Sequence, residues 1–292
     1  MHSVDWGEFR EVCGVRFEPE DWRETIDGGQ AFTWFKTGSE NEYAGVFGGV
    51  AARAKLLESG AVAAAFPKSL NAPRSLRAFE NYLDAGTDYR AIRARLKNLR
   101  DPKMARALEA YPTLRILRQS PSEAIVGFIC SSSKRIVQIK QCVSLLSKKF
   151  GKKICGNFYS LPSFDALAEA DLEDILACKL GFRARYLSCA ARKIVADKFN
   201  PEDLRKMEYS DAKKYLLSLS GVGDKVADCI LLFGCSRFEA FPVDTWIRQA
   251  MDKLYHTGGD PCSIRKFAAE KFPQYAGFAQ QLLFATMRNN ML

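Results

Sequence analysis

Residues 212–234 read AKKYLLSLSGVGDKVADCILLFG, and this stretch decides the fold of the chain. Apolar residues recur at helical spacing on both sides of a glycine-containing turn. They are Tyr215, Leu216 and Leu219 before the turn, and Val226, Ile230 and Phe233 after it. Glycine adopts positive φ at little cost, so the connection can turn sharply. The pattern predicts two helices joined by a hairpin.

The hairpin tip, Gly221, Val222 and Gly223, is predicted to bind DNA. The glycines leave backbone N–H groups open to a phosphate, and the second helix directs its positive N-terminal end to the same place. A Leu-x-Gly-Val-Gly-x-Lys sequence between two amphipathic helices is typical of DNA-binding hairpins. The alternative is a helix–turn–helix whose role is packing alone.

The distribution of charge favours an anionic partner. The chain has 43 Lys and Arg residues against 34 Asp and Glu residues, a formal net charge of +9. Up to Lys103, 15 basic residues balance 15 acidic ones, so the whole excess lies in the rest of the chain. A basic body attached to a neutral lobe is typical of a protein that meets a polyanion, although basic proteins without such a partner are common.

Cysteine and histidine usage excludes several metal sites. The 9 cysteines form no CxxC pair and no closely spaced quartet, which excludes a zinc ribbon and a four-cysteine iron–sulfur cluster. Two histidines cannot build a His-rich zinc site. We therefore expect no metal and no cofactor. The odd number of cysteines, mostly in apolar helical stretches, predicts reduced and buried thiols.

Neither a targeting signal nor a membrane span is expected. The first residues lack the apolar centre of a signal peptide, and no run approaches the ~18 apolar residues of a span. We expect an intracellular protein, cytoplasmic or nucleoid-associated, with no membrane partner.

The chain is predicted to be α+β, with an N-terminal antiparallel β-sheet lobe and its helices packed on a mostly α-helical domain. Short aromatic or Val-containing runs bounded by glycine and polar residues predict the strands. These strands are 28–35, 43–50, near 51–57 and near 61–66, followed by helical sequence over 74–97. From about residue 104, pairs of an N-cap and a proline, such as Ser120-Pro121, predict helices. Since no flexible linker occurs, we set domains at 1–103 and 104–292 and expect them to pack together.

Two charged residues next to the hairpin have a chemical and a plain interpretation. Lys225 lies in the first turn of the second helix, where the dipole disfavours a cation, and a neutral amine is a nucleophile. A surface lysine near a phosphate is the commoner case. Asp244 follows Pro242-Val243, where the next helix is expected to begin. It is either an N-cap worth about 1 kcal/mol or a carboxylate held at the mouth of a cleft.

The hairpin segment that contains Lys225 and the segment that ends at Asp244 together resemble the helix–hairpin–helix–Gly/Pro–Asp superfamily of DNA glycosylases. Within it, they resemble the 8-oxoguanine DNA glycosylase/AP lyases. The motif is Gly-Val-Gly-x-Lys-Val-Ala-Asp-Cys over 221–229, followed by Pro-Val-Asp over 242–244. Further stretches that match the family are 29–34, 117–121, 128–132, 181–186 and 275–284. The resemblance therefore covers nearly the whole chain. The missing cysteine quartet distinguishes it from the endonuclease III and adenine-mispair branches, and the lysine distinguishes it from the monofunctional alkyladenine branch.

The resemblance implies a bifunctional enzyme that rotates 8-oxoguanine out of duplex DNA and excises it. Lys225 would attack C1′ and displace the base, and the Schiff base would then permit β-elimination, the AP-lyase step. Asp244 would stabilise the oxocarbenium-like sugar and help to deprotonate the amine. The implied partner is double-stranded DNA containing 8-oxoguanine. We expect a monomer, because nothing in the sequence indicates a stable oligomer.

The resemblance also assigns the residues that bind the base. The main-chain carbonyl of Gly29 would accept the N7–H that guanine lacks. Phe284 would stack on the base, Gln280 would bond its Watson–Crick edge, and Cys229 would pack on the other face. Without the resemblance, these are a turn glycine, two positions on an amphipathic helix and a buried cysteine.

Departures from the family pattern predict a relaxed preference for the opposite base. Ser133 and the two residues after it stand where eukaryotic relatives have asparagines, which favours a bacterial source. Gln138 stands where an arginine would grip the orphaned cytosine. Arg183 is present for that contact, and Phe182 would serve as the wedge. Trp246 replaces the histidine often found two residues after the aspartate, which puts a phosphate contact in doubt.

Two other functions stay open at this point. One is a DNA-binding relative that keeps the fold without chemistry. The other is a glycosylase of the same fold that acts on another damaged purine, such as an alkylated one. The first is opposed by the joint presence of four residues: Lys225, Asp244, Phe284 and Gln280. Through the resemblance, Gly29, Cys229 and Gln280 argue against the second.

Overall fold

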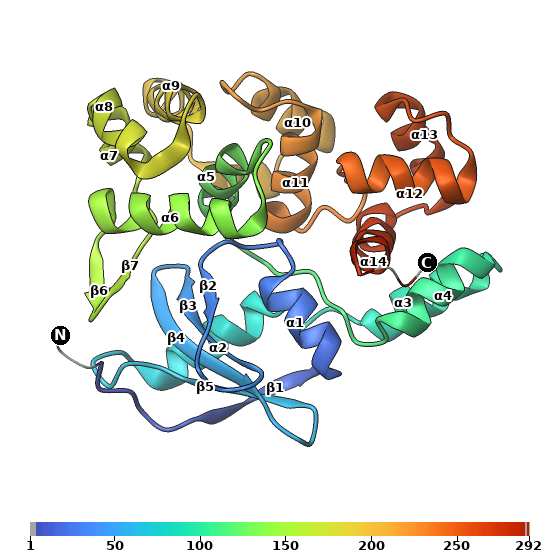
Figure 1. Cartoon of the computed structure of the whole chain (residues 1–292), viewed down its shortest axis with the longest axis horizontal. Coiled ribbons are helices and arrows are strands. Elements are labelled where there is room, and N and C mark those ends of the chain that lie inside the picture. Colours follow the sequence, from blue (N-terminus) through green and yellow to red (C-terminus); the bar gives the residue numbers. More distant parts are fainter. Residues whose placement is uncertain (1–3, 290, 292) are drawn as a thin grey trace.

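The computed structural model describes residues 4–289 and 291, and it places an antiparallel sheet lobe against a mostly helical part (Figure 1). Within these residues the sheet has five strands in the order β1-β5-β4-β3-β2. The strands are β1 Arg10–Arg16, β2 Trp34–Lys36, β3 Glu42–Phe47, β4 Val50–Leu56 and β5 Ala61–Ala65. The predicted α+β class is confirmed.

A two-residue turn sets the register of the central hairpin. Phe47 pairs with Val50, and both Gly48 (φ 52°) and Gly49 (φ 74°) adopt positive φ. Such turns match the right-handed twist of the strands that they join. The core of the lobe forms beneath this hairpin around Trp34, which is fully buried and donates a hydrogen bond of 2.9 Å to the Tyr82 hydroxyl.

Fourteen α-helices occur in the described residues. They are α1 Pro19–Asp27, α2 Ala72–Tyr82, α3 Tyr89–Asn98, α4 Pro102–Ala110, α5 Pro121–Ser131, α6 Ile136–Phe150, α7 Phe164–Glu169, α8 Leu172–Ile175, α9 Arg183–Ala196, α10 Tyr209–Leu217, α11 Asp224–Cys235, α12 Thr245–Tyr255, α13 Pro261–Lys271 and α14 Ala276–Arg288. A π-helical turn, Leu176–Leu180, and a 3₁₀ helix, Pro201–Arg205, complete the helical structure. The side chains of Ser120, Asn200 and Asp260 accept hydrogen bonds from backbone N–H groups at helix starts, which confirms the predicted caps.

Several elements differ from the prediction. Of the predicted strand 28–35, only the last two residues belong to β2, and the rest is a loop in which Gly29 has φ 103°. Strand β1 escaped prediction because its pairing with β5 shifts register around Gly14, which interrupts the alternation of buried residues. The hairpin of β6 Lys153–Cys155 and β7 Phe158–Tyr159, inside the helical part, was also not predicted.

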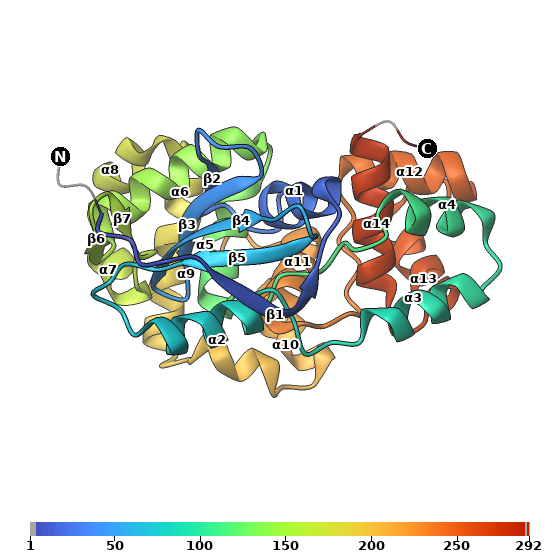
Figure 2. The same ribbon diagram turned by 90° about the horizontal axis from the view of Figure 1, so that it is seen from below.

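The two parts of the chain share a core as well as a surface. Helix α3 lies within 1–103 but runs beside α14 (Figures 1 and 2), and the Tyr89 ring packs edge-on against Phe278 at 5.3 Å between centroids. Conversely, Leu117 of the helical part belongs to the core of the sheet lobe. We keep 1–103 and 104–292 as the proposed limits of the two domains in the sequence.

The cysteines divide by position. All nine are free thiols. The buried ones are Cys130, Cys142, Cys178, Cys229 and Cys235, whereas Cys13, Cys189 and Cys262 are exposed. The prediction of buried thiols is therefore correct for five of them and wrong for the three exposed ones, while Cys155 is half-buried. No helix among the described residues combines the length and apolar character needed to cross a bilayer.

Candidate active site

The hairpin between α10 and α11 is held against α9 by a glycine. Gly221 has φ 79°, and a Cβ atom there would lie 2.6 Å from the Cβ of Tyr186. Gly223, the N-cap of α11, faces open space with φ −94°. Val222 buries its side chain, so only its backbone is available to a ligand. The tip therefore combines one glycine required by packing with one whose surroundings are open to an approaching phosphate.

The two glycines give a direct prediction about stability. Gly221→Ala should destabilise the protein by roughly 2–4 kcal/mol, because the methyl group meets Tyr186 and the left-handed backbone is strained. Gly223→Ala should cost no more than about 1 kcal/mol, since nothing opposes its methyl group. Urea unfolding of both variants checks this. Equal losses of stability would contradict the packing role of Gly221.

Lys225 lies half-buried in the first turn of α11, next to α5. Its ammonium nitrogen is 5.7 Å from the centre of the Phe128 ring. Phe128 in turn contacts Phe32, which follows the Gly28-Gly29 loop, at 5.4 Å between ring centroids. Cys229 lies one helical turn after Lys225 in α11. Burial raises the pKa of its thiol to about 11, although the charge of Lys225 lowers it. The Cys229 thiol is therefore neutral and beside Lys225.

Asp244 has the capping role that was one of its two predicted interpretations. It is the N-cap of α12, and its Oδ1 accepts a hydrogen bond of 2.8 Å from the Ile247 N–H. Burial raises the pKa of its carboxyl group, and the positive charge of Lys225 opposes that rise together with the hydrogen bond from Ile247. The carboxylate is thus a cap and also lies in the electrostatic field of Lys225.

The predicted base-binding residues come from α11, α14 and the loop after α1. Helix α14 packs closely on α11, because a Cβ at Gly277 would lie 2.5 Å from Leu232 Cδ1. The Gly28 carbonyl receives a hydrogen bond of 2.6 Å from Arg288 at the end of α14, and Arg288 lies over the ring of Phe284. The end of α1 therefore lies beside α14, as Figures 1 and 2 show.

Two acceptors in this region have no partner. Gln280 is buried, and its Oε1 accepts no hydrogen bond from any described residue. Among the hydrogen bonds of residues 4–289 and 291, none ends on the Gly29 carbonyl oxygen, although the carbonyls of both of its neighbours accept one. A buried polar group left unpaired costs free energy, so the Gln280 oxygen is suited to a ligand that donates. Gly29 is half-buried, and its carbonyl can accept from a ligand or from solvent.

The remaining predicted DNA contacts lie around the starts of α6 and α9. Phe182 is 57% exposed, and Ser133 and Gln138 are also exposed. Gln138 caps α6 by accepting a hydrogen bond of 3.1 Å from the Arg135 N–H. Arg183 is buried instead, and its guanidinium donates to the carbonyls of Ser132 and Leu180 at 2.5 and 3.1 Å. Trp246, in the first turn of α12, is 43% exposed.

Three side chains important to this site drew no functional prediction. Phe128 lies in a stretch that matches the family but had no assigned role, and Lys140 and Arg288 were not named in the sequence analysis. The one local signal was the position of Arg288, one helical turn after Phe284. No group of three or more His, Cys, Asp or Glu side chains that could hold a metal occurs among the described residues.

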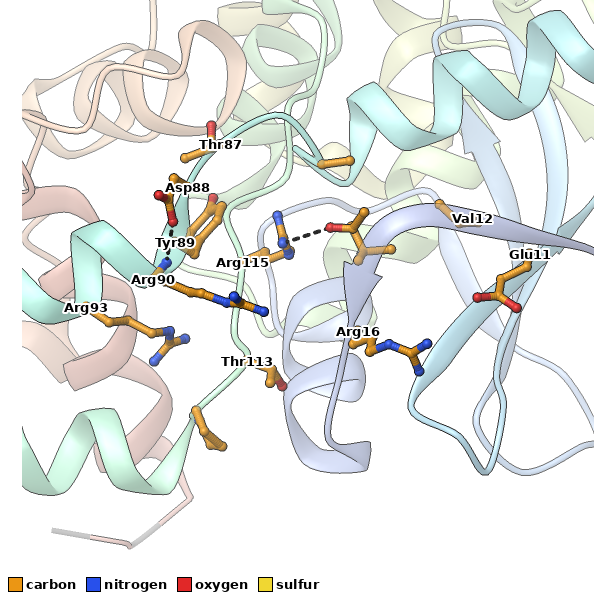
Figure 3. Close-up of a pocket in the computed structure, with 14 residues that line it drawn as sticks. Glu11, Val12, Arg16, Thr87, Asp88, Tyr89, Arg90, Arg93, Thr113 and Arg115 are labelled. Carbon is orange, nitrogen blue, oxygen red and sulfur yellow. Dashed lines mark hydrogen bonds between the residues drawn. The ribbon is translucent and has the colours of Figure 1, made fainter.

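A cavity of about 680 Å³ lies elsewhere, between β1, the start of α3 and residues 112–115 (Figure 3). Lys225, Asp244 and Gln280 are not among its lining residues. Most of its arginines are used within the fold, as donors to backbone carbonyls: Arg16 to Ser59, Arg93 to Leu114, and Arg115 to Gly14 and Asp84. We assign this cavity no part in the chemistry.

Comparison with known proteins identifies two family regions. Residues 16–125 match the N-terminal domain of 8-oxoguanine DNA glycosylase, and residues 126–274 match the HhH-GPD superfamily of base excision DNA repair proteins. The chain is 32% identical to a probable N-glycosylase/DNA lyase of Methanothermobacter thermautotrophicus over 66% of this chain and 70% of that protein. It is 28% identical to N-glycosylase/DNA lyase OGG1 of Arabidopsis thaliana over 89% of this chain and 75% of that protein.

A solved structure covers the whole architecture. The 8-oxoguanine glycosylase/lyase of Clostridium acetobutylicum, in complex with double-stranded DNA containing cytosine opposite 8-oxoguanine, superposes with a TM-score of 0.86 at 32% identity. The match covers 99% of this chain and 100% of that one. This chain belongs to the 8-oxoguanine DNA glycosylase family of the HhH-GPD superfamily.

Proposed function

We propose that this protein is a bifunctional DNA glycosylase and AP lyase that excises 8-oxoguanine from double-stranded DNA. The observation that carries the proposal is a half-buried amine that acts electrostatically on a nearby carboxylate. Lys225 at the start of α11 lies in the field of Asp244 at the start of α12. Covalent catalysis needs a nucleophile and a charged group held on rigid elements, and the location of both residues at helix starts supports that role.

The chemistry follows from these two groups. The Lys225 amine, once neutral, attacks C1′ of the extruded nucleotide, and the bond between C1′ and N9 breaks as the base leaves with a proton. The Asp244 carboxylate stabilises the positive charge that develops on the sugar. The lone pair of the nitrogen then breaks the bond between C1′ and O4′, O4′ takes up a proton from solvent, and the open sugar is left as a protonated Schiff base. Removal of a proton from C2′ then breaks the bond between C3′ and its phosphate oxygen, which is the lyase step.

Base selection rests on the two unpartnered acceptors. In 8-oxoguanine N7 carries a hydrogen, whereas in guanine N7 is an acceptor that would face the Gly29 carbonyl oxygen without a hydrogen between them. Gln280 would meet the Watson–Crick edge, and Phe284 and Cys229 would enclose the two faces of the base. A site built to receive a particular N–H discriminates strongly against an analogue that lacks it.

Borohydride trapping tests the function directly. The wild-type protein is incubated with duplexes that contain 8-oxoguanine, guanine or an alkylated purine, and covalent adducts are separated on a denaturing gel. The proposal expects an adduct with the 8-oxoguanine duplex alone. An adduct with the alkylated purine alone would favour the second glycosylase function, and no adduct with any duplex would favour a non-catalytic relative.

We also propose that the protein has a relaxed preference for the base opposite 8-oxoguanine, because the side chains that would contact that base are engaged within the protein. The Gly221–Gly223 backbone would bind phosphates and Phe182 would fill the gap in the duplex. Arg183 is engaged by two backbone carbonyls, and Gln138 is engaged in a helix cap. Excision rates opposite C, A, G and T should therefore agree within about tenfold, since a bidentate base contact is worth about 1–3 kcal/mol. Single-turnover kinetics on four duplexes measure this, and a steep preference for cytosine would contradict it.

A further inference from the structure

The four residues 27–30 are held in place by three separate parts of the chain: α6, α14 and the segment before α5. Asp27 forms an ion pair with Lys140 of α6, and the Gly28 carbonyl accepts from Arg288 of α14. The Gly29 Cα faces Ile136 of α6, because a Cβ there would be 3.0 Å from Ile136 Cδ1. The Gln30 carbonyl accepts a hydrogen bond of 2.6 Å from the Gln119 side chain. Of the carbonyls of Gly28, Gly29 and Gln30, that of Gly29 accepts no hydrogen bond from a described residue and is left to a ligand or to solvent.

Arg288 contacts this segment and the preceding helix through two nitrogens of its guanidinium. One nitrogen donates to the Gly28 carbonyl at 2.6 Å, and the other forms an ion pair with Glu24, whose side chain is buried within α1. The same guanidinium lies over the ring of Phe284, 5.4 Å from its centre. A guanidinium is planar and its N–H groups point in fixed directions, so one that bonds two acceptors sets the position of both. Arg288 therefore links the peptide next to Gly29 to the ring that would stack on the base.

Lys140 holds the other side of the loop and is itself buried at 7% exposure. Its ammonium donates to the Trp34 carbonyl at 2.6 Å, pairs with Asp27 and lies 5.4 Å from the centre of the Phe35 ring. A buried ammonium is retained where several acceptors surround it, as they do here. The cation ties the end of α1 and the start of β2 to α6.

We propose that Arg288 and Lys140 are positioning residues that hold the Gly29 carbonyl in the orientation needed to recognise 8-oxoguanine. The inference rests on the proposed function, because it concerns the pocket for the excised base. The physical need arises from Gly28-Gly29 itself: two successive glycines have little intrinsic preference for one backbone conformation. Without the two cations, the peptide that carries the acceptor would sample several orientations, and the N7–H would meet its partner in only some of them.

The test compares two reactions of the same enzyme. Excision of 8-oxoguanine needs the base pocket, whereas incision of a preformed AP site needs Lys225 but no base. In Arg288→Met combined with Glu24→Gln, which leaves no uncompensated buried carboxylate, excision should fall about 10- to 100-fold. Incision at the AP site should stay within about twofold of wild type. Lys140→Met should give the same divergence between the two reactions.

A matched ion pair in the sheet lobe provides the control. Arg53 of β4 pairs with buried Glu42 of β3 and lies 5.5 Å from the centre of the Phe9 ring, much as Arg288 pairs with Glu24 and covers Phe284. Arg53→Met combined with Glu42→Gln should leave the ratio of the two reactions at the wild-type value. Equal loss of both reactions in the Arg288 variant, or loss of neither, would overturn the proposal.

The outcomes also separate this inference from the proposed function. A wild-type protein that excises no 8-oxoguanine would overturn the function, and with it the reason for a positioned carbonyl. A wild-type protein that excises 8-oxoguanine beside an Arg288 variant with unchanged rates would overturn the inference alone.

Discussion

Lys225→Gln is expected to abolish the borohydride-trapped adduct and to lower excision of 8-oxoguanine by roughly 10⁴- to 10⁶-fold, the scale found when a covalent nucleophile is removed. Glutamine keeps most of the length and polarity of the side chain, but its amide nitrogen has no lone pair available for attack on C1′. Lys225 contacts the edge of the core through Phe128 rather than filling it, so the protein should remain folded. Gel analysis of trapped adducts and single-turnover excision measure the two losses.

This result needs a control variant in which a lysine outside the site is replaced in the same way. Lys206, whose side chain is 83% exposed next to the Pro201–Arg205 turn, carries the same charge. Lys206→Gln should keep both the adduct and the excision rate. A Lys225→Gln protein that still forms the adduct would show that a different amine attacks the sugar, and the proposed role of Lys225 would be abandoned.

Asp244→Asn should keep the fold and DNA binding while it removes most of the turnover, by roughly 10²- to 10⁴-fold. Asparagine is as good an N-cap as aspartate, so its side-chain oxygen can still accept from the Ile247 N–H. What disappears is the negative charge that faces Lys225 and the developing charge on the sugar. Circular dichroism, duplex binding and single-turnover rates separate these effects.

The pH dependence gives an independent check on Asp244. Burial raises the pKa of this carboxyl group, and only its ionised form can stabilise a cationic sugar. The excision rate of the wild type should therefore fall as the pH drops through that raised pKa, and Asp244→Asn should lack this acidic limb.

The Asp244→Asn change should affect the stability of the fold in the opposite sense to its effect on the excision rate. A group with a raised pKa in the folded state favours folding when it is protonated, and that contribution is lost as the pH rises. At neutral pH the asparagine variant should therefore be at least as stable as the wild type. Unfolding of the variant would show instead that the ionised carboxylate of Asp244 is needed for the fold.

Local sequence was sufficient wherever the physical signal spans only a few residues. The Ser120 and Asp260 caps and the start of α12 at Asp244 follow from side chains that bond the backbone three positions away. The hairpin over 212–234 follows from helical periodicity on either side of its glycines. The family resemblance added candidate roles to positions such as Gln280 that helical periodicity alone would leave ordinary. The local features could be predicted because the interactions that stabilise them join residues within about one helical turn of each other.

The sequence by itself thus determined the α+β class, the hairpin and the pair of charged residues at two helix starts. Tertiary structure alone decided that Arg183 is buried, that residues 28–33 form a loop instead of a strand, and that Lys140 and Arg288 hold that loop. The physical reason is distance along the chain: Lys140 meets a carboxylate 113 positions away, and Arg288 meets a carbonyl 260 positions away. No periodicity or cap encodes such a contact, because it exists only after separate elements have packed and excluded water between them.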